Sequence, residues 1–213
     1  LGLCTSQPIQ TGSPRTFSKN DCVVTMTSTG VTADLANSTV ALPSMTGRPA
    51  SKTYSHAYII ITNTFGLRGS VSIQNGSGDE VKYCSGTNGD STAGTTAASG
   101  FCTAQDHTET LDDFGDGSFS AYFAPATMDG GGKVSALLTA ADANLTTATN
   151  TGEVKRLIGV FETNSGTPVV INDSTNGLEM QLTVTDIGYG IQFVNGEPYN
   201  FGSMPFKPVF ATF

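Results

Sequence analysis

Residues 178–185 read Leu-Glu-Met-Gln-Leu-Thr-Val-Thr and decide the fold class. Apolar and polar side chains alternate along the whole stretch, which is the period of a β-strand. Leu178, Met180, Leu182 and Val184 fall on one side of such a strand, and their polar neighbours fall on the other. The stretch therefore predicts a strand with one core face and one wet face.

Short runs of similar character continue outward from this stretch. They are rich in β-branched and aromatic residues and are separated by clusters of Gly, Asn, Asp, Ser and Pro. This pattern is typical of antiparallel sandwiches and barrels. We predict a mainly β chain that forms an antiparallel, jelly-roll-like β-sandwich with at most one or two short helices. The expected strands lie near residues 22–27, 39–42, 54–62, 69–74, 81–84, 118–123, 154–162, 168–171, 178–185, 190–194 and 197–201.

The clearest hairpin signal is Asn195-Gly196, one of four Asn-Gly pairs that fall between expected strands. A type I′ turn needs positive φ angles at both central residues, and Asn-Gly supplies them. Pro198 cannot donate to a ladder, so the second strand of this hairpin should be an edge or carry a bulge. The final run, 206–213, is apolar to its last residue. We expect it to dock into a sheet, because a frayed end would leave its phenylalanines in water.

One segment has a different period. Val134, Leu137, Leu138, Ala141 and Leu145 are spaced like one face of a helix. Three glycines precede the segment, and 150–152 offers a natural stop. The spacing predicts a short helix within residues 134–146.

The four cysteines are Cys4, Cys22, Cys84 and Cys102, and both sequential pairs are separated by 18 residues. Four cysteines allow three connectivities, and we favour the two local disulfides because they place the fewest constraints on the fold. The second would make residues 84–102 a stapled surface loop within a single domain, 1–213. If 85–101 were instead a linker, the chain would divide into two halves.

Structural disulfides indicate an oxidising compartment, so we expect a secreted protein that is extracellular or at the cell surface.

The composition excludes several classes of protein. Charged residues make up 13% of the 213 residues, and the net charge is −8. An acidic chain without basic clusters has no electrostatic basis for binding nucleic acid. Its hydrophobic runs are too short for a membrane-spanning helix, so we expect no membrane insertion.

An acidic segment follows the second cysteine pair. Residues 106–116 hold five of the eighteen acidic residues. Oxygen ligands at this density are typical of calcium sites. Asp112 and Asp116 match two EF-hand positions, but Phe114 and Phe123 stand where ligands are required. Asp112, Asp113 and Asp116 are therefore candidates for a calcium site of another kind, and a solvated acidic loop is the alternative. We expect no other cofactor.

Sets of residues that would indicate catalysis are missing from the sequence. There is no Gly-x-Ser-x-Gly motif, His56 and His107 are the two histidines, and the chain has no tryptophan. A nucleophilic triad or a glycosidase site is therefore not expected. The hypothesis of an extracellular hydrolase would be supported only if changing His107 or Asp106 abolished an activity.

We therefore expect a non-enzymatic structural protein whose partners are copies of itself. Exposed sheet edges and terminal strands can add to a neighbour, as in many extracellular fibres. Phe206, Val209, Phe210 and Phe213 are the candidate assembly residues in the terminal run. The composition resembles that of subunits of bacterial surface filaments, such as pili and fimbriae, and of adhesins.

Two alternatives stay open. The first is a monomeric, lectin-like adhesin that holds a surface glycan with the 84–102 loop and the acidic segment, with or without calcium. The second is a viral capsid jelly roll.

Overall fold

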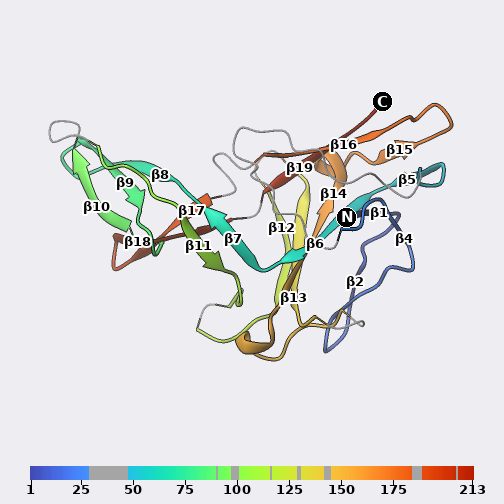
Figure 1. Ribbon diagram of the computed structural model, residues 1–213, viewed down its shortest axis with the longest axis horizontal. Helices are drawn as coiled ribbons and strands as arrows, with labels where there is room; N and C mark the ends of the chain where they lie inside the picture. Colours follow the sequence, from blue (N-terminus) through green and yellow to red (C-terminus); the bar gives the residue numbers. More distant parts are fainter. Residues whose placement is uncertain are drawn as a thin grey trace. The chain divides into compact units, whose positions relative to one another are not determined.

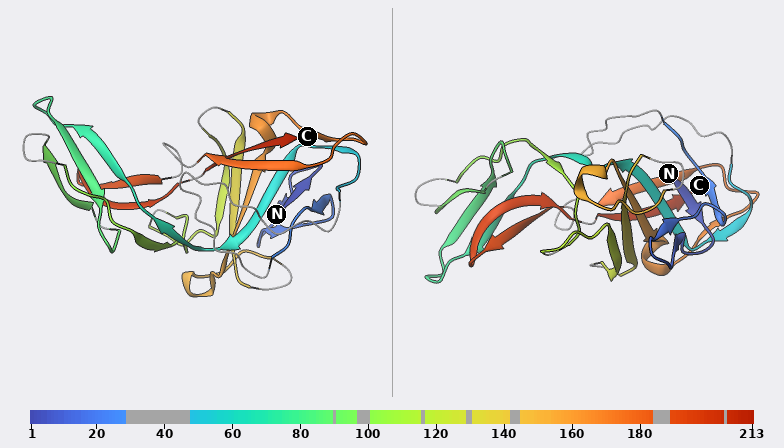
Figure 2. Two further views of the ribbon diagram at one scale, coloured as in Figure 1. Left: turned by 45° about the horizontal axis from the view of Figure 1, so that its top comes forward. Right: turned by 90° about the horizontal axis from the view of Figure 1, so that it is seen from below.

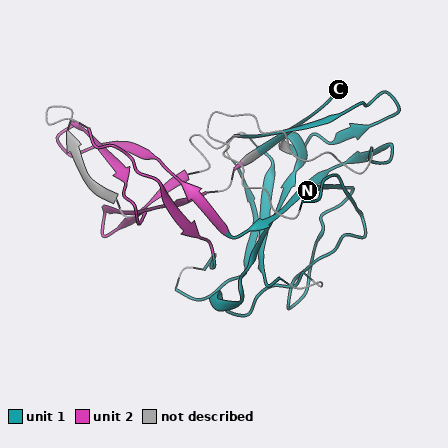
Figure 3. Cartoon of the chain, in the orientation of Figure 1, with its two compact units in different colours: residues 1–63, 112–183, 207–213 teal, residues 64–111, 184–206 magenta. Residues whose placement is uncertain are grey.

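The computed structural model describes residues 1–28, 48–89, 91–96, 101–115, 117–128, 131–141, 145–183, 189–204 and 206–213. The chain forms two compact units, each built from separate stretches (Figure 3). Unit 1 comprises residues 1–63, 112–183 and 207–213, and unit 2 comprises residues 64–111 and 184–206. Within the described ranges, no helix has the length and hydropathy needed to cross a membrane.

The mainly β, antiparallel fold class is confirmed. Unit 1 is organised around a six-stranded sheet in which every neighbouring pair of strands is antiparallel (Figure 1). In sheet order the strands are β12 (Tyr122–Thr127), β13 (Lys133–Thr139), β14 (Arg156–Glu162), β6 (His56–Thr62), β1 (Gly2–Cys4) and β4 (Cys22–Val24).

Both faces of this sheet are buried. Successive residues of a strand point to opposite faces, so Leu3 and Cys4 belong to different hydrophobic clusters. We call them cluster A, on the Cys4 side, and cluster B, on the Leu3 side. Cluster A consists of Cys4, Ile9, Phe17, Tyr58, Leu137, Leu145, Ile158 and Val160. Cluster B consists of Leu3, Tyr54, Ala57, Val169, Ile171 and Phe210.

Short strand pairs supply the residues that cover the two faces. On the cluster A side, β2 (Ile9–Gln10) pairs with β3 (Thr16–Phe17). On the cluster B side, β15 (Val169–Ile171) pairs with β5 (Lys52–Tyr54), and β16 (Leu178–Thr183) pairs with β19 (Lys207–Thr212). Two short 3-10 turns, η2 (Thr151–Glu153) and η3 (Thr163–Gly166), flank β14.

The helix predicted within 134–146 is wrong: residues 133–139 form strand β13. This strand lies between β12 and β14, and each of its residues from Val134 to Thr139 is buried. A strand covered on both faces has no wet side, so its apolar residues can also fit a helical spacing. The glycines before it make the hairpin turn, with positive φ angles at Gly131 and Gly132.

Unit 2 is built from smaller sheets. β9 (Glu80–Ser85) pairs with β8 (Ser70–Gln74) and with β10 (Ser91–Thr96). β7 (Thr64–Leu67) pairs with β11 (His107–Thr110), and β17 (Tyr189–Val194) pairs with β18 (Glu197–Ser203). The 84–102 stretch lies wholly within unit 2.

The expected β17–β18 hairpin is confirmed. Asn195 and Gly196 both have positive φ angles, and the register shifts next to Pro198, as its missing N–H requires. Asn75-Gly76 and Asn176-Gly177 do not adopt positive φ angles, so these pairs are not type I′ turns. Both local disulfides are present, Cys4–Cys22 and Cys84–Cys102. The strand expected at 39–42 lies outside the described residues.

Candidate functional site

The β16–β19 pair carries the terminal run on which the assembly prediction rested, and the two strands run side by side in each view (Figures 1 and 2). Just beyond the ladder, Gly177 and Phe213 exchange both backbone hydrogen bonds, at 2.9 and 3.2 Å. In an antiparallel ladder such pairs alternate with pairs whose N–H and C=O point outward. The even-numbered residues of both strands, including Met180 opposite Phe210, therefore direct their backbone groups away from the ladder.

The outer edge of β19 is closed at its centre. The side-chain amide of Asn164 donates from Nδ2 to the Phe210 carbonyl at 2.9 Å, and its Oδ1 accepts from the Phe210 N–H at 2.6 Å. This amide takes the place of a neighbouring strand at that position. Two residues earlier, Pro208 occupies another outward position and has no N–H to offer. Strand β19 therefore offers little to an added strand.

The outer edge of β16 is open. No described residue hydrogen-bonds to the outward N–H and C=O groups of Leu178, Met180 or Leu182. The side chains of Leu178 and Met180 pack against cluster B, whereas Glu179 and Gln181 are exposed. The predicted alternation between a core face and a wet face is confirmed for residues 178–182.

The edges of the six-stranded sheet differ from this one. Strand β12 contains Pro125 and a register irregularity between Phe123 and Ala126. Strand β4 at the opposite edge is only three residues long. Proline, bulges and short length are the usual devices that prevent edge-to-edge association. Strand β16 has none of them.

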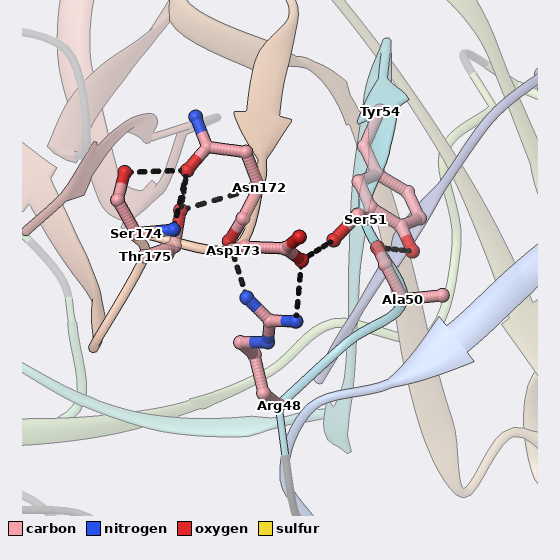
Figure 4. A network of polar contacts seen from close by, with 8 residues as sticks. All are labelled: Arg48, Ala50, Ser51, Tyr54, Asn172, Asp173, Ser174 and Thr175. Carbon is pink, nitrogen blue, oxygen red and sulfur yellow. Dashed lines mark hydrogen bonds and ion pairs between the residues drawn. The ribbon is translucent and has the colours of Figure 1, made fainter.

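A polar network anchors the turn that leads from β15 into β16 (Figure 4). The Arg48 guanidinium donates to the Asn172 carbonyl and to Asp173 Oδ1, the latter at 3.2 Å. Ser51 Oγ donates to the same Asp173 oxygen at 3.0 Å. These hydrogen bonds, that of Ser51 first, and the charge of Arg48 lower the pKa of Asp173. The turn is thereby tied to the segment that enters β5.

The structure divides the predicted assembly residues. Phe210 is 4% exposed and belongs to cluster B, whereas Phe206 is half-buried. Val209 and Phe213 are exposed, by 38% and 69%. The terminal run is docked into a sheet as expected, so the surface part of the assembly prediction reduces to Val209 and Phe213.

A second candidate site lies in unit 2 around His107. This side chain is 5% exposed, and neither of its ring nitrogens has a hydrogen-bond partner among the described residues. A neutral imidazole offers one donor and one acceptor, and leaving such groups buried and unpaired costs about 1–3 kcal/mol each. The ring lies near that of Tyr189, at 6.1 Å between centroids, and burial raises the pKa of Tyr189.

His107 lines a shallow depression with a volume of about 490 Å³. Asp106 on its rim lies 3.7 Å from Arg68 and forms an exposed ion pair with it. The remaining lining is neutral and carries amide, hydroxyl and backbone groups. It consists of Gly66, Thr87, Asn88 and Thr108.

The three candidate calcium residues have different outcomes in the structure. Asp113 Oδ1 accepts backbone hydrogen bonds from Gly115 at 2.7 Å and Ser120 at 2.8 Å. These bonds, that from Ser120 first, lower the pKa of Asp113. Asp112 is half-buried, and Asp116 lies outside the described residues. Within the described part of the chain, no three His, Cys, Asp or Glu side chains gather as a metal site would need.

Sequence reasoning missed Asn164. Its partner strand is 46 residues away, and Asn164-Ser165-Gly166 has the composition of an ordinary turn. Its φ of 44° is a conformation in which Asn is enriched, so the local geometry was predictable. The two hydrogen bonds by which Asn164 clamps Phe210 were not. The sequence did single out His107, although only as a residue whose change would test for a hydrolase and not as a buried group.

The chain matches no family model, no curated protein and no solved structure.

Proposed function

We propose that this protein is a non-enzymatic, extracellular structural subunit that assembles with copies of itself by β-strand addition, as in a surface filament or pilus-like appendage. One observation carries the proposal: no described residue hydrogen-bonds to the outer edge of β16, and this strand lacks the devices that protect the edges of the six-stranded sheet. An added strand would satisfy the backbone groups of Leu178, Met180 and Leu182. Its apolar face would extend cluster B.

Two further properties support the proposal. Both disulfides are of the kind that persists in an oxidising environment such as the cell exterior. Charged residues make up only 13% of the chain, so a contact between two copies would remove few charged side chains from water.

The test is sedimentation velocity and negative-stain electron microscopy of the native protein over a range of concentrations. Self-assembly predicts species larger than the 22.0 kDa chain, and fibres or regular oligomers at high concentration. A monomer at every concentration overturns the proposal.

A matched pair of variants locates the edge. Leu182→Pro removes an outward N–H, and Leu182→Ala loses the same packing but keeps that donor. We expect the proline variant to associate much more weakly than the alanine variant. Equal association of the two would show that strand addition does not occur at this edge.

The second candidate function is a binding module for a neutral, hydroxyl-rich ligand such as a surface glycan. It is favoured by the His107 nitrogens, which have no partner in the described part of the chain, beside a depression lined by Thr and Asn. A glycan-array screen in calcium and in chelator, repeated with Asn88→Ala, tests it. Binding that Asn88→Ala abolishes would support this function, and an array without binding would remove it.

A further inference from the structure

The partner that the open β16 edge accepts can be derived from its backbone and its charges. We propose that this partner is β16 of a second copy, antiparallel across a two-fold axis, with Met180 opposite Met180. The inference rests on the proposed function and specifies its elementary contact. The result is a continuous four-stranded sheet in the order β19, β16, β16, β19.

Backbone geometry restricts the possible registers. Among the described residues of this strand, Leu178, Met180 and Leu182 direct both N–H and C=O to the open edge, because Gly177 and Phe213 fix which residues face β19. A hydrogen-bonded pair across the interface must therefore join two of these three residues. Three two-fold registers keep at least two such pairs within the strand, and they are centred on Glu179, Met180 or Gln181.

Within the described strand, the register centred on Met180 forms the most hydrogen-bonded pairs. Met180 pairs with Met180 of the second copy, and Leu178 pairs with Leu182 on each side of the axis. All three outward residues of each copy are thereby used. The register centred on Gln181 places Leu178 opposite residue 184, which lies outside the described residues, so it joins only two pairs within the described strand. The register centred on Glu179 likewise leaves Leu182 without a partner in the strand.

Charge complementarity favours the same register. With Met180 at the centre, each Glu179 lies opposite Gln181 of the second copy. Within one chain, Gln181 Nε2 already donates to Glu179 Oε1 at 2.9 Å, so amide and carboxylate share the exposed face. A register centred on Glu179 would instead place two carboxylates directly opposite each other, which is destabilising.

The two faces of the joined strands also match. Leu178 and Met180 of each copy contact its own cluster B, so the apolar side chains of both copies meet on one side. The Glu and Gln side chains meet on the other side, in water. Because the same patch serves both copies, the contact is isologous and closes as a dimer. A filament then needs a second interface elsewhere on the subunit.

Three variants test the register by sedimentation equilibrium. Gln181→Glu places Glu opposite Glu twice across the axis, so we expect the dimer dissociation constant to rise roughly 2- to 30-fold. Gln181→Lys places Lys opposite Glu twice, so the constant should fall by a similar factor. The exchange variant E179Q/Q181E restores Gln opposite Glu, and its constant should return to the wild-type value.

The exchange variant also separates the competing registers. It would strengthen association if the axis passed through residue 179, since a Glu–Glu contact would become Gln–Gln. It would weaken association if the axis passed through residue 181, for the opposite reason. Either result overturns the Met180-centred register while leaving self-assembly intact. A wild-type protein that stays monomeric overturns the proposed function itself, so the two failures are distinguishable.

Discussion

Units 1 and 2 are stabilised in different ways. Unit 1 has a six-stranded sheet with a hydrophobic cluster on each face. In the described part of unit 2, the buried hydrophobic side chains are those of Cys84 and Phe201, and the sheets have two or three strands. Sheets of this size are marginal without added packing or crosslinks. We infer that unit 1 depends on its core and unit 2 on its disulfide.

The two disulfides make the contrast testable, because both close loops with a sequence separation of 18 residues. Loop closure alone gives each the same stabilisation, about 3 kcal/mol. Cys4 and Cys22 lie directly opposite each other on β1 and β4, and β1 is also paired with β6. The Cys4–Cys22 disulfide therefore joins strands of unit 1 that are also held by the six-stranded sheet. The Cys84–Cys102 disulfide closes an equal loop in unit 2, where few buried side chains support it.

The largest expected effect follows removal of the second disulfide in C84A/C102A. A loss of about 3 kcal/mol should exceed the local stability of unit 2, so its strands should open while unit 1 stays folded. Hydrogen exchange measured by mass spectrometry should show loss of protection in peptides from β9 and β17. Peptides from β14 should keep theirs.

The control is C4A/C22A. It should lower the free energy of unfolding by a similar amount and leave the protection of β13, β14 and β6 in place. If both double variants opened their own units to the same extent, the contrast between a core and a crosslink would be wrong.

A smaller effect is expected in unit 1 when the clamp on β19 is removed by Asn164→Ala. Two hydrogen bonds to Phe210 are lost, at a cost of about 1–3 kcal/mol. Cluster B should keep the strand docked, so unit 1 still unfolds in one transition. Chemical denaturation measures the cost. Asn164→Gly, which suits the positive φ, separates loss of the clamp from backbone strain.

The same variants compare the two edges of the β16–β19 pair. Unclamping exposes the Phe210 N–H and C=O, so a second strand-addition edge becomes available. We expect higher oligomers from both Asn164 variants than from the wild type by sedimentation velocity. Unchanged association would indicate that Pro208 alone keeps this edge closed.

Local sequence patterns predicted the elements whose environment is itself local. The alternation at 178–185 predicted β16, and Asn195-Gly196 predicted its hairpin. Both disulfides followed from cysteine spacing. These features depend on side-chain alternation, on turn geometry and on the sequence separation of the cysteines. All three can be read from short stretches of sequence.

The features that sequence reasoning missed depend on distant partners. The pattern of residues 134–146 predicted a helix, because a strand buried on both faces, such as β13, loses its alternation. Which edge of the β16–β19 pair is open depends on Asn164, which lies 46 residues before Phe210 in the sequence. Phe210 was predicted as an assembly residue because apolarity alone does not distinguish core from surface. The candidate site was therefore foreseeable as a strand but not as an open edge.

The smallest expected effect is a pH dependence that acts on unit 1 through His56. This residue of β6 lies opposite Glu162 of β14 and contacts Ser55, with 2.9 Å between Ser55 Oγ and His56 Nδ1. Burial lowers the pKa of His56 from its ordinary value of 6.5, and the charge of Glu162 offsets part of this effect. The unfolded chain therefore binds the proton more readily than the folded one. Stability is fully present above pH 6.5 and falls as the pH drops from 6.5 through the folded pKa.

Other groups act in different windows, which makes the effect of His56 separable. Burial lowers the pKa of the Leu1 amino group from 8.0, so its contribution changes at higher pH. Asp113 and Asp173 have pKa values lowered from 3.8, so their contributions are lost only in stronger acid. His56→Gln should therefore flatten the fall in melting temperature between about pH 7 and pH 5. Hydrogen exchange should assign the wild-type change to β6 and β14. A variant whose melting temperature falls as steeply as that of the wild type would place the acid sensitivity elsewhere in the chain.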